Sequence, residues 1–191
     1  IFSSASSVVD KVERNPVGED HPALPQTPYA VSKLAAEDYV RTFSSLHGLS
    51  HIIFRFFNVY GPGQRGGVVP ALYRSLKAKG GFTIFGDGKA RRDFIFVDDV
   101  VDVLCSAIRA DHVKNETVNL GTGVGTSILE LVGLASKILG MEHVVIMHMP
   151  PRLGEISNFE ADTTKLRRLF GERTFTPLEE GLRKTFDWLS N

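Results

Sequence analysis

The chain contains a single cysteine, Cys105, and no long uninterrupted hydrophobic run. One thiol excludes a disulfide within the chain and argues against a zinc cluster, which favours a reducing compartment such as the cytoplasm. No segment reaches the roughly 18 apolar residues that a membrane-spanning helix needs, so we expect no membrane insertion. Cys105 itself lies in the apolar run "VDVLCSAIRA", where we expect a buried and unreactive thiol.

An excess of charge of one sign is also missing. Lys+Arg and Asp+Glu both number 22 in the 191 residues, which gives a formal net charge of +0. This balance shows no electrostatic footprint for nucleic acid or for an anionic membrane surface. The 42% hydrophobic content instead predicts a globular protein with a sizeable core.

Predicted strands alternate with predicted helices along the chain. Thr27 is a candidate N-cap and Pro28 suits a first helical turn, so we predict a helix from there to about Leu46. Residues 51–61, rich in Ile, Phe, Val and Tyr, predict one strand buried on both faces. Further helices are predicted over residues 68–79, after an N-cap at Asp98, over residues 127–139, and twice near the C-terminus. Extended segments are predicted over residues 82–88, 91–97, 116–123 and 143–149. This alternation predicts an α/β fold with a mainly parallel sheet.

The segment "TPYAVSKLAAEDYV" places Tyr29 and Lys33 four residues apart at the start of the first helix, and therefore on one helix face. A Lys ammonium beside a phenol favours its ionised form. An ionised phenol can accept the proton of a substrate hydroxyl. The same spacing also occurs on ordinary solvated helices, so this pair alone does not decide between catalysis and structure.

Several motifs in a fixed order carry a resemblance that extends over essentially all 191 residues. They are "IFSSASSVV", "YAVSK", "RFFNVYGPGQ", "IFGDGKARRDFIFVDDVV", "VNLGTG" and "RLGE". In them the chain resembles the extended short-chain dehydrogenase/reductase family, the NAD-dependent sugar-nucleotide epimerases and dehydratases, and in particular its UDP-glucose 4-epimerase-like members. The resemblance implies the C-terminal portion of a Rossmann-like doubly wound parallel sheet, joined to a small α/β domain that binds a nucleotide sugar.

The resemblance implies roles for the residues around the Tyr-Lys pair. Tyr29 would act as the acid/base beside the NAD cofactor. Lys33 would bind the nicotinamide ribose and favour the phenolate of Tyr29, and Phe57 would lie near the cofactor. The family's catalytic Ser or Thr aligns with Ala5, so we assign its hydroxyl to Ser4, with Ser6 as the alternative.

The resemblance also implies a binding site for a UDP-sugar. Asn58 would hydrogen-bond the sugar-linked diphosphate, and Arg92 and Arg152 would neutralise its charge, because an Arg fork donates bidentately to phosphate oxygens. Glu155 would accept from the nucleotide ribose hydroxyls. Backbone atoms of Gly67 and Val68 would contact the nucleotide. Roles without ligand binding stay open for these residues. Arg91 and Arg92 could be a solvated pair, and Arg152 and Glu155 could form a surface ion pair.

The family's glycine-rich turn, Gly-x-x-Gly-x-x-Gly after a first strand, has no counterpart in these residues. The segment "GTGVGTS", which begins at Gly121, follows a strand but matches a late family motif, so we predict a tight turn and not a pyrophosphate cradle. We therefore expect a piece of a longer protein: residues 1–62 as the end of the NAD-binding domain, and 63–191 as mainly substrate-binding, with about 98–125 returning to the sheet. Such a piece should bind NAD poorly and expose a strand edge.

The choice among the reaction types of the family rests on which catalytic residues this chain lacks. A 4,6-dehydratase of the family carries an Asp-Glu pair directly after the catalytic Thr, where this chain has the neutral Ser6 and Ser7. This argues for epimerisation at C4 of a UDP-hexose, with NAD as cofactor, by a protein that is a homodimer when complete. A dehydratase or reductase of the same family, or an inactive nucleotide-diphosphate-binding remnant, remains an alternative.

Overall fold

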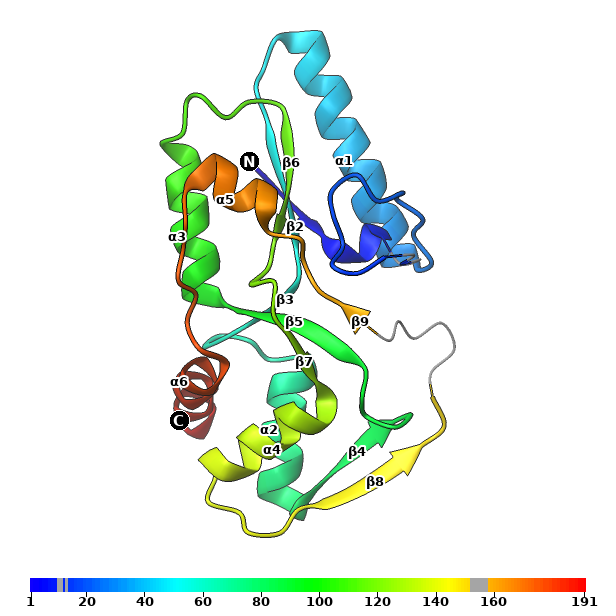
Figure 1. Ribbon diagram of the computed structural model, residues 1–191, viewed down its shortest axis with the longest axis vertical. Coiled ribbons are helices and arrows are strands. Elements are labelled where there is room, and N and C mark those ends of the chain that lie inside the picture. The colour runs from blue at the N-terminus through cyan, green and yellow to red at the C-terminus, as the bar shows by residue number, and fades with distance from the viewer. Residues whose placement is uncertain (10–11, 13, 152–157) are drawn as a thin grey trace.

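The structure is a computed structural model, and it describes residues 1–9, 12, 14–151 and 158–191. The molecule is elongated: β1, β2 and β6 build one half with α1, α3 and α5, and α2, α4 and α6 build the other with β4 and β8 (Figure 1). The elements in chain order are β1 (Phe2–Ala5), a 3₁₀ turn η1 (Ser6–Val9), α1 (Pro28–His47), β2 (Ile52–Phe56), β3 (Asn58–Tyr60), α2 (Val68–Lys79), β4 (Gly81–Phe85), β5 (Arg91–Phe96), α3 (Val97–Ile108), β6 (Glu116–Leu120), β7 (Gly125–Ser127), α4 (Ile128–Ile138), β8 (Val145–Met149), β9 (Asn158–Phe159), α5 (Thr164–Phe170) and α6 (Leu178–Ser190).

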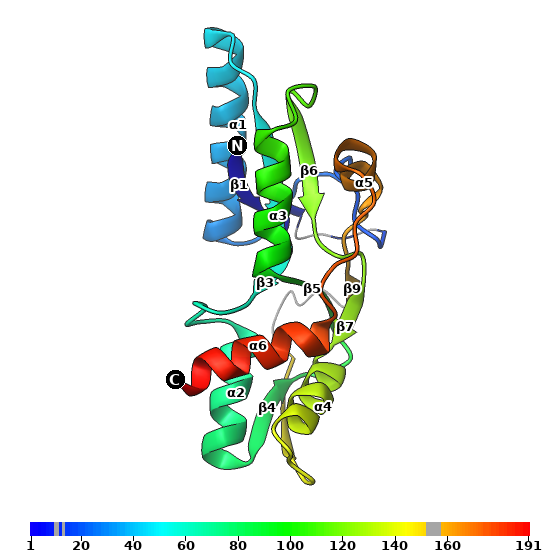
Figure 2. The same ribbon diagram turned by 90° about the vertical axis from the view of Figure 1, so that its left-hand side faces the viewer.

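A three-stranded parallel sheet of order β1-β2-β6 organises the upper half. Its register pairs Ala5 with Phe56 and Phe56 with Leu120, so the carboxyl ends of the three strands lie level. Helix α1 lies on one side of this sheet and α5 on the other, as the turned view shows (Figure 2). The predicted α/β fold with a parallel sheet is confirmed.

The strand predicted over residues 51–61 is in fact two strands in two different sheets. β2 ends at Phe56, and β3 begins at Asn58 and pairs in parallel with β5. Phe57, between them, is buried and its ring stacks on Phe159, with the ring centroids 5.1 Å apart. The chain therefore leaves the first sheet at this residue, and a single-strand prediction misses the step because both pieces are apolar.

Helix α1 begins where the sequence predicts. The Thr27 hydroxyl accepts a hydrogen bond from the Ala30 amide at 3.1 Å, and the helix ends at His47, followed by Gly48 in the left-handed conformation with φ 64°. The prediction for α3 is wrong at its start. Phe96 is the N-cap of α3, and Asp98 lies inside the first turn.

Cys105 is exposed, so the prediction of a buried thiol is wrong. Helix α3 is apolar on more than one face, but only the face with Val100, Val103 and Ala107 is buried. Apolar character alone therefore did not identify the packed face. None of the helices in the described parts of the chain combines the length and apolar character needed to cross a membrane. The division of the chain near residue 62 stays a prediction.

Candidate active site

A cavity of about 410 Å³ lies at the carboxyl ends of β1 and β2. This edge of a parallel sheet is where α/β proteins bind their ligands. The cavity is lined by Ser3, Ser4, Ala5, Ser6, Ser7, Tyr29, Lys33, Phe56, Phe57, Asn58 and Val59. The fold thus brings together five predicted site residues that lie on β1, α1 and the β2–β3 junction.

Tyr29 and Lys33 share one wall of this cavity. The Lys33 ammonium donates to the Ser3 carbonyl at 2.9 Å and lies 5.9 Å from the centroid of the Tyr29 ring. It also lies 5.5 Å from the centroid of the Phe2 ring. The Tyr29 side chain is more than half exposed, at 57%. A fixed cation beside an accessible phenol is an arrangement that suits proton transfer to and from a bound substrate.

The Ser4 hydroxyl has a partner away from the Tyr-Lys pair. It donates to Glu37 Oε1 at 2.6 Å, and Ser4 is buried. Glu37 is fully buried and accepts two further bonds from Arg55, from Nε at 3.0 Å and from Nη2 at 2.9 Å. Arg41 donates to the same carboxylate at 2.6 Å. Ser4 is therefore engaged as a structural contact between β1 and α1.

The charge state of Glu37 follows from these partners. Burial alone would raise the pKa of the Glu37 carboxyl, but the hydrogen bonds from Arg55 and Ser4 and the positive charge of Arg55 outweigh it. The pKa of Glu37 accordingly lies below its usual value. Because Glu37 follows Lys33 by four residues, this buried ion cluster fixes the face of α1 that also carries Tyr29 and Lys33.

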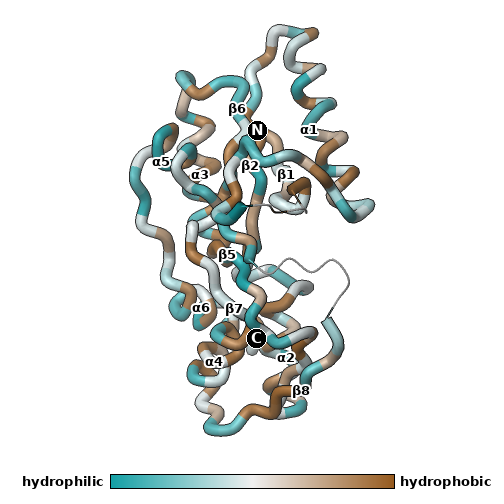
Figure 3. The backbone as a smooth tube through the Cα atoms, turned by 45° about the vertical axis from the view of Figure 1, so that its right-hand side comes forward, coloured by the Kyte–Doolittle hydropathy of each residue, from teal (hydrophilic) through white to brown (hydrophobic). Residues whose placement is uncertain are grey.

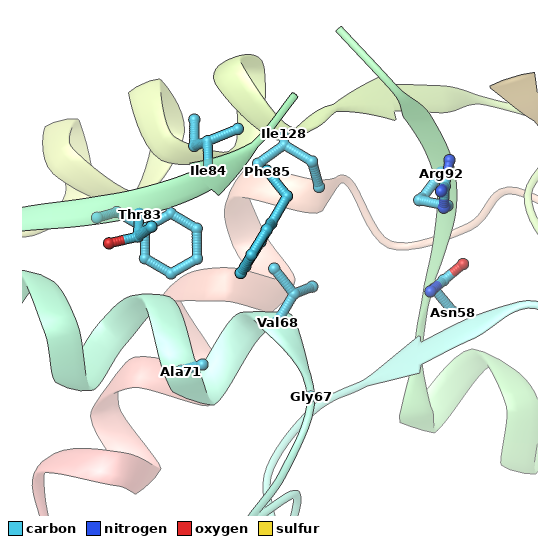
Figure 4. Close-up of a pocket in the computed structure, with 10 residues that line it drawn as sticks. Asn58, Gly67, Val68, Ala71, Thr83, Ile84, Phe85, Arg92 and Ile128 are labelled. Atoms are coloured by element: carbon cyan, nitrogen blue, oxygen red, sulfur yellow. The ribbon is translucent and has the colours of Figure 1, made fainter. Parts of the chain in front are cut away.

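A second cavity, of about 570 Å³, lies between α2, β4 and β5. It is lined by Asn58, Gly67, Val68, Ala71, Phe82, Thr83, Ile84, Phe85, Arg92 and Ile128. Figure 4 shows Asn58 and Arg92 together at one end and the apolar side chains at the other. Asn58 lines both cavities, so it joins the Tyr-Lys site to this one.

The two neighbouring arginines of β5 have different surroundings. Arg91 donates to Glu160 at 3.2 Å, to Glu130 at 3.4 Å and to the Gly125 carbonyl, which makes it a structural link from β5 to β7, to α4 and to the segment after β9. Arg92 donates to the Arg91 carbonyl at 2.8 Å, and its side chain lies in the cavity wall. Arg152 and Glu155 lie outside the described residues, so their predicted roles stay predictions.

The glycine turn after β6 is filled by a protein carboxylate. Asp93 accepts from the Thr122 amide at 2.8 Å, the Thr122 hydroxyl at 2.7 Å and the Gly123 amide at 2.8 Å. It also accepts from the Ala161 amide at 3.1 Å. These amides are occupied by Asp93 and cannot donate to a phosphate at the same time. This confirms the prediction that the segment is a tight turn and not a pyrophosphate cradle.

A family model for the NAD dependent epimerase/dehydratase family matches residues 1–121. The chain belongs to this family. The resemblance noted in the sequence is thereby confirmed.

Individual members of the family are similar over nearly the whole chain. A UDP-glucose 4-epimerase of Mycolicibacterium smegmatis is 36% identical over 99% of this chain and 61% of its own length. The crystal structure of UDP-glucose 4-epimerase from Thermotoga maritima with UDP-glucose has a TM-score of 0.90 at 32% identity, covering 99% of this chain and 62% of that one. An NAD-dependent NDP-hexosamine 5,6-dehydratase involved in tunicamycin biosynthesis has a TM-score of 0.85 at 33% identity, covering 98% and 62%. The chain therefore spans about three fifths of the length of these relatives.

Sequence reasoning missed two parts of this epimerase/dehydratase site. The first is strand β4, whose residues Phe82–Phe85 line the second cavity. The second is the Glu37 cluster, although Arg55 inside the apolar stretch "IIFRFF" signalled that a buried charge needs a partner. Within the described residues, no group of three or more His, Cys, Asp or Glu side chains is placed to hold a metal ion.

Proposed function

We propose that the whole protein is an NAD-dependent nucleotide-sugar epimerase that inverts C4 of a UDP-hexose by transient oxidation. The observation that carries this proposal is the position of Asn58, which lines both the Tyr-Lys cavity and the second cavity. One ligand that spans the two cavities would have a nucleotide end and a reacting end. A nucleotide sugar has this form, and the family and its named members support the choice.

The second cavity suits the UDP part of such a ligand. Its apolar side chains, which include Val68, Ile84 and Phe85, offer surface to a flat base. Arg92 would neutralise the diphosphate and Asn58 would hydrogen-bond it, at the end nearer to Tyr29. Gly67 is the N-cap of α2 and makes no side-chain cap hydrogen bond, so backbone amides at this helix start would be available to the ligand. From the family resemblance, Arg152 and Glu155 would complete the site on the diphosphate and the ribose.

The first cavity suits the sugar and the nicotinamide ribose. Tyr29 would accept the proton of the sugar 4-hydroxyl and return it after the sugar has turned over. Lys33, held by the Ser3 carbonyl, would bind the ribose, and Phe57 would form part of the wall behind it. NAD, when bound, would take the C4 hydride and return it to the other face of the sugar.

A dehydratase is the second candidate, because the tunicamycin-pathway dehydratase is among the structural neighbours. Elimination of water needs an acid and a base besides Tyr29, and the cavity wall offers only the neutral Ser6 and Ser7 at the positions that the family uses. This favours epimerisation. A reductase, or a remnant that binds a nucleotide diphosphate without turnover, would use the same second cavity.

The outer face of α1 supports our proposal for the quaternary state, a homodimer. Five residues spaced by three or four form an exposed apolar stripe along this helix, opposite its buried face, and hydrophobic positions are visible along α1 in Figure 3. The α1 stripe consists of Val31, Ala35, Tyr39, Phe43 and Leu46. We place it in a homodimer interface of the whole protein.

With one cysteine and a nucleotide-sugar substrate, we also propose a cytoplasmic location.

The direct test is turnover of UDP-glucose and UDP-N-acetylglucosamine by the whole protein with NAD, followed by NMR of the sugar anomeric signals. We expect a mixture of C4 epimers from at least one of them. Tyr29→Phe should lower kcat about 10²- to 10⁴-fold, because the proton acceptor is lost. The same variant should leave UDP affinity unchanged. Activity of Tyr29→Phe within a few-fold of the wild type would contradict the acid/base assignment.

A further inference from the structure

The 3₁₀ turn after β1 contains a hydroxyl that the fold does not use. Ser7 Oγ is shielded from solvent and has no hydrogen-bond partner among the residues that the structure describes. Ser7 itself is half-buried and lines the first cavity together with Tyr29 and Lys33. Its hydroxyl differs in this from that of Ser4, which is bound to Glu37 at 2.6 Å.

A buried hydroxyl without a partner destabilises the fold, because it has lost its hydrogen bonds to water and gained none. An alanine at this position would avoid that cost. Rotation about one side-chain bond moves a serine oxygen between three staggered positions. A sugar in the adjoining cavity could therefore supply the partner that the protein does not.

The neighbouring residues narrow the choice of hydroxyl. Ala5 lines the same cavity and carries none. Ser4 is bound to Glu37, and the Ser3 carbonyl already holds Lys33. In this turn, Ser7 is the residue whose hydroxyl is shown to be buried and without a partner in the described structure.

We propose that Ser7 supplies the hydroxyl that hydrogen-bonds the sugar hydroxyl deprotonated by Tyr29. In this role Ser7 orients the oxygen of the substrate and remains neutral throughout, and the proton passes between the sugar and Tyr29. The proposal rests on the proposed function, since it assumes that a sugar occupies the first cavity.

The test compares Ser7→Ala, Ser7→Thr, Ser6→Ala and the distant surface variant Ser136→Ala in the whole protein with NAD. We expect Ser7→Ala to lower kcat/KM for the turned-over UDP-sugar about 10- to 100-fold, the usual effect of losing one hydrogen bond to a reacting group. Ser7→Thr keeps a hydroxyl and should recover most of the activity. Ser6→Ala should lose less than Ser7→Ala, and Ser136→Ala should match the wild type.

Two further readouts separate this role from a structural one. Ser7→Ala should melt at the same or a higher temperature than the wild type, because no bond within the protein is lost. It should bind UDP unchanged and weaken the binding of the UDP-sugar. An unchanged kcat/KM in Ser7→Ala, or a larger loss in Ser6→Ala, would overturn the proposal.

The proposed function can fail on its own. If the wild type turns over neither UDP-glucose nor UDP-N-acetylglucosamine, the epimerase assignment fails, and Ser7 is judged by binding alone. A higher Kd of Ser7→Ala for UDP-glucose at an unchanged Kd for UDP would then support the contact. Equal Kd values for both ligands in wild type and variant would overturn it.

Discussion

Glu37 has no exposed surface, yet four hydrogen bonds keep its carboxylate charged. Two guanidinium groups compensate the lost hydration, and Arg55 does so from within a buried strand. A buried ion cluster of this kind adds little net stability over an apolar one, but loss of one member leaves an uncompensated charge. Loss of Glu37 would therefore remove the contacts that join α1, which also carries Tyr29, to Ser4 on β1 and to Arg55 on β2.

We predict that Glu37→Gln destabilises the protein by about 3–5 kcal/mol at pH 7, because Arg55 loses its buried counter-charge. The pKa of Glu37 is lowered by folding, so its contribution is fully present above its unfolded-state pKa of about 4.3 and is lost as the pH falls through the lower folded-state value. The difference in unfolding free energy between wild type and variant should thus shrink between pH 7 and pH 3. Urea unfolding at both pH values measures it.

Glu180→Gln is the matched control for this experiment. Glu180 forms an exposed ion pair with Lys184 on α6, and its side chain is 54% exposed. Loss of such a surface pair should change stability by less than about 1 kcal/mol. A Glu37→Gln deficit that is the same at pH 7 and pH 3 would contradict the charged state assigned to Glu37.

At the scale of elements, helix α1 has one face packed against the sheet and an exposed apolar face. One carries Glu37 and the buried Ser44 against the sheet, and the other carries the α1 stripe, with Tyr39 71% and Leu46 75% exposed. The Tyr39 and Phe43 rings are stacked with centroids 6.1 Å apart, so part of this apolar surface is already ordered. An ordered apolar stripe on a solvent-facing helix is typical of a surface that another protein surface covers.

We predict that Tyr39→Glu and Leu46→Glu shift the whole protein from dimer to monomer, because each places a charge within the apolar stripe, Tyr39 at its middle and Leu46 at its C-terminal end. Ser45→Glu, which also lies on the exposed surface of α1 but off the stripe, should remain a dimer. Light scattering coupled to size-exclusion chromatography measures the mass. A wild type that is monomeric at micromolar concentration would remove the basis of the prediction, and dimers in both stripe variants would show that the interface lies elsewhere.

The sequence predicts elements better than it predicts contacts. Thr27, Pro28 and Gly48 mark both ends of α1, because caps act through neighbours in the chain. The break at Phe57 depends on Phe159, about a hundred residues later, and no local pattern contains it. The same holds for the serines: the sequence left Ser4 and Ser6 open, and the hydrogen bond that engages the Ser4 hydroxyl goes to Glu37, on another element. The Tyr29–Lys33 pair was predictable from spacing, whereas the lining of the second cavity by β4 was not.

At the scale of the whole molecule, the described residues contain the second cavity, for which we propose a nucleotide, and the Tyr-Lys cavity, and Asn58 lines both. Among the described residues, the glycine turn that follows β6, at Gly121–Gly123, is filled by Asp93. The described residues thus support the proposed binding of a sugar nucleotide and of the nicotinamide end of NAD, whereas the amides of this turn are already bound to Asp93.

We therefore predict that the 191-residue chain binds UDP but does not bind NAD saturably in the micromolar range. Calorimetric titration with each ligand separately measures both, and Arg92→Ala, which removes a charge from the second cavity, should weaken UDP binding alone. Saturable micromolar NAD binding would contradict the prediction. Equal UDP binding by wild type and Arg92→Ala would contradict the place assigned to the diphosphate.

In the proposed reaction, C4 of the sugar is oxidised and reduced again on the same protein. The most direct measurement follows UDP-glucose that carries deuterium at C4 through turnover by the whole protein with NAD. We predict UDP-galactose that retains the deuterium at C4, because the hydride leaves and returns without exchange with water. Loss of the label from C4, or a dehydrated product in place of the C4 epimer, would contradict the claim.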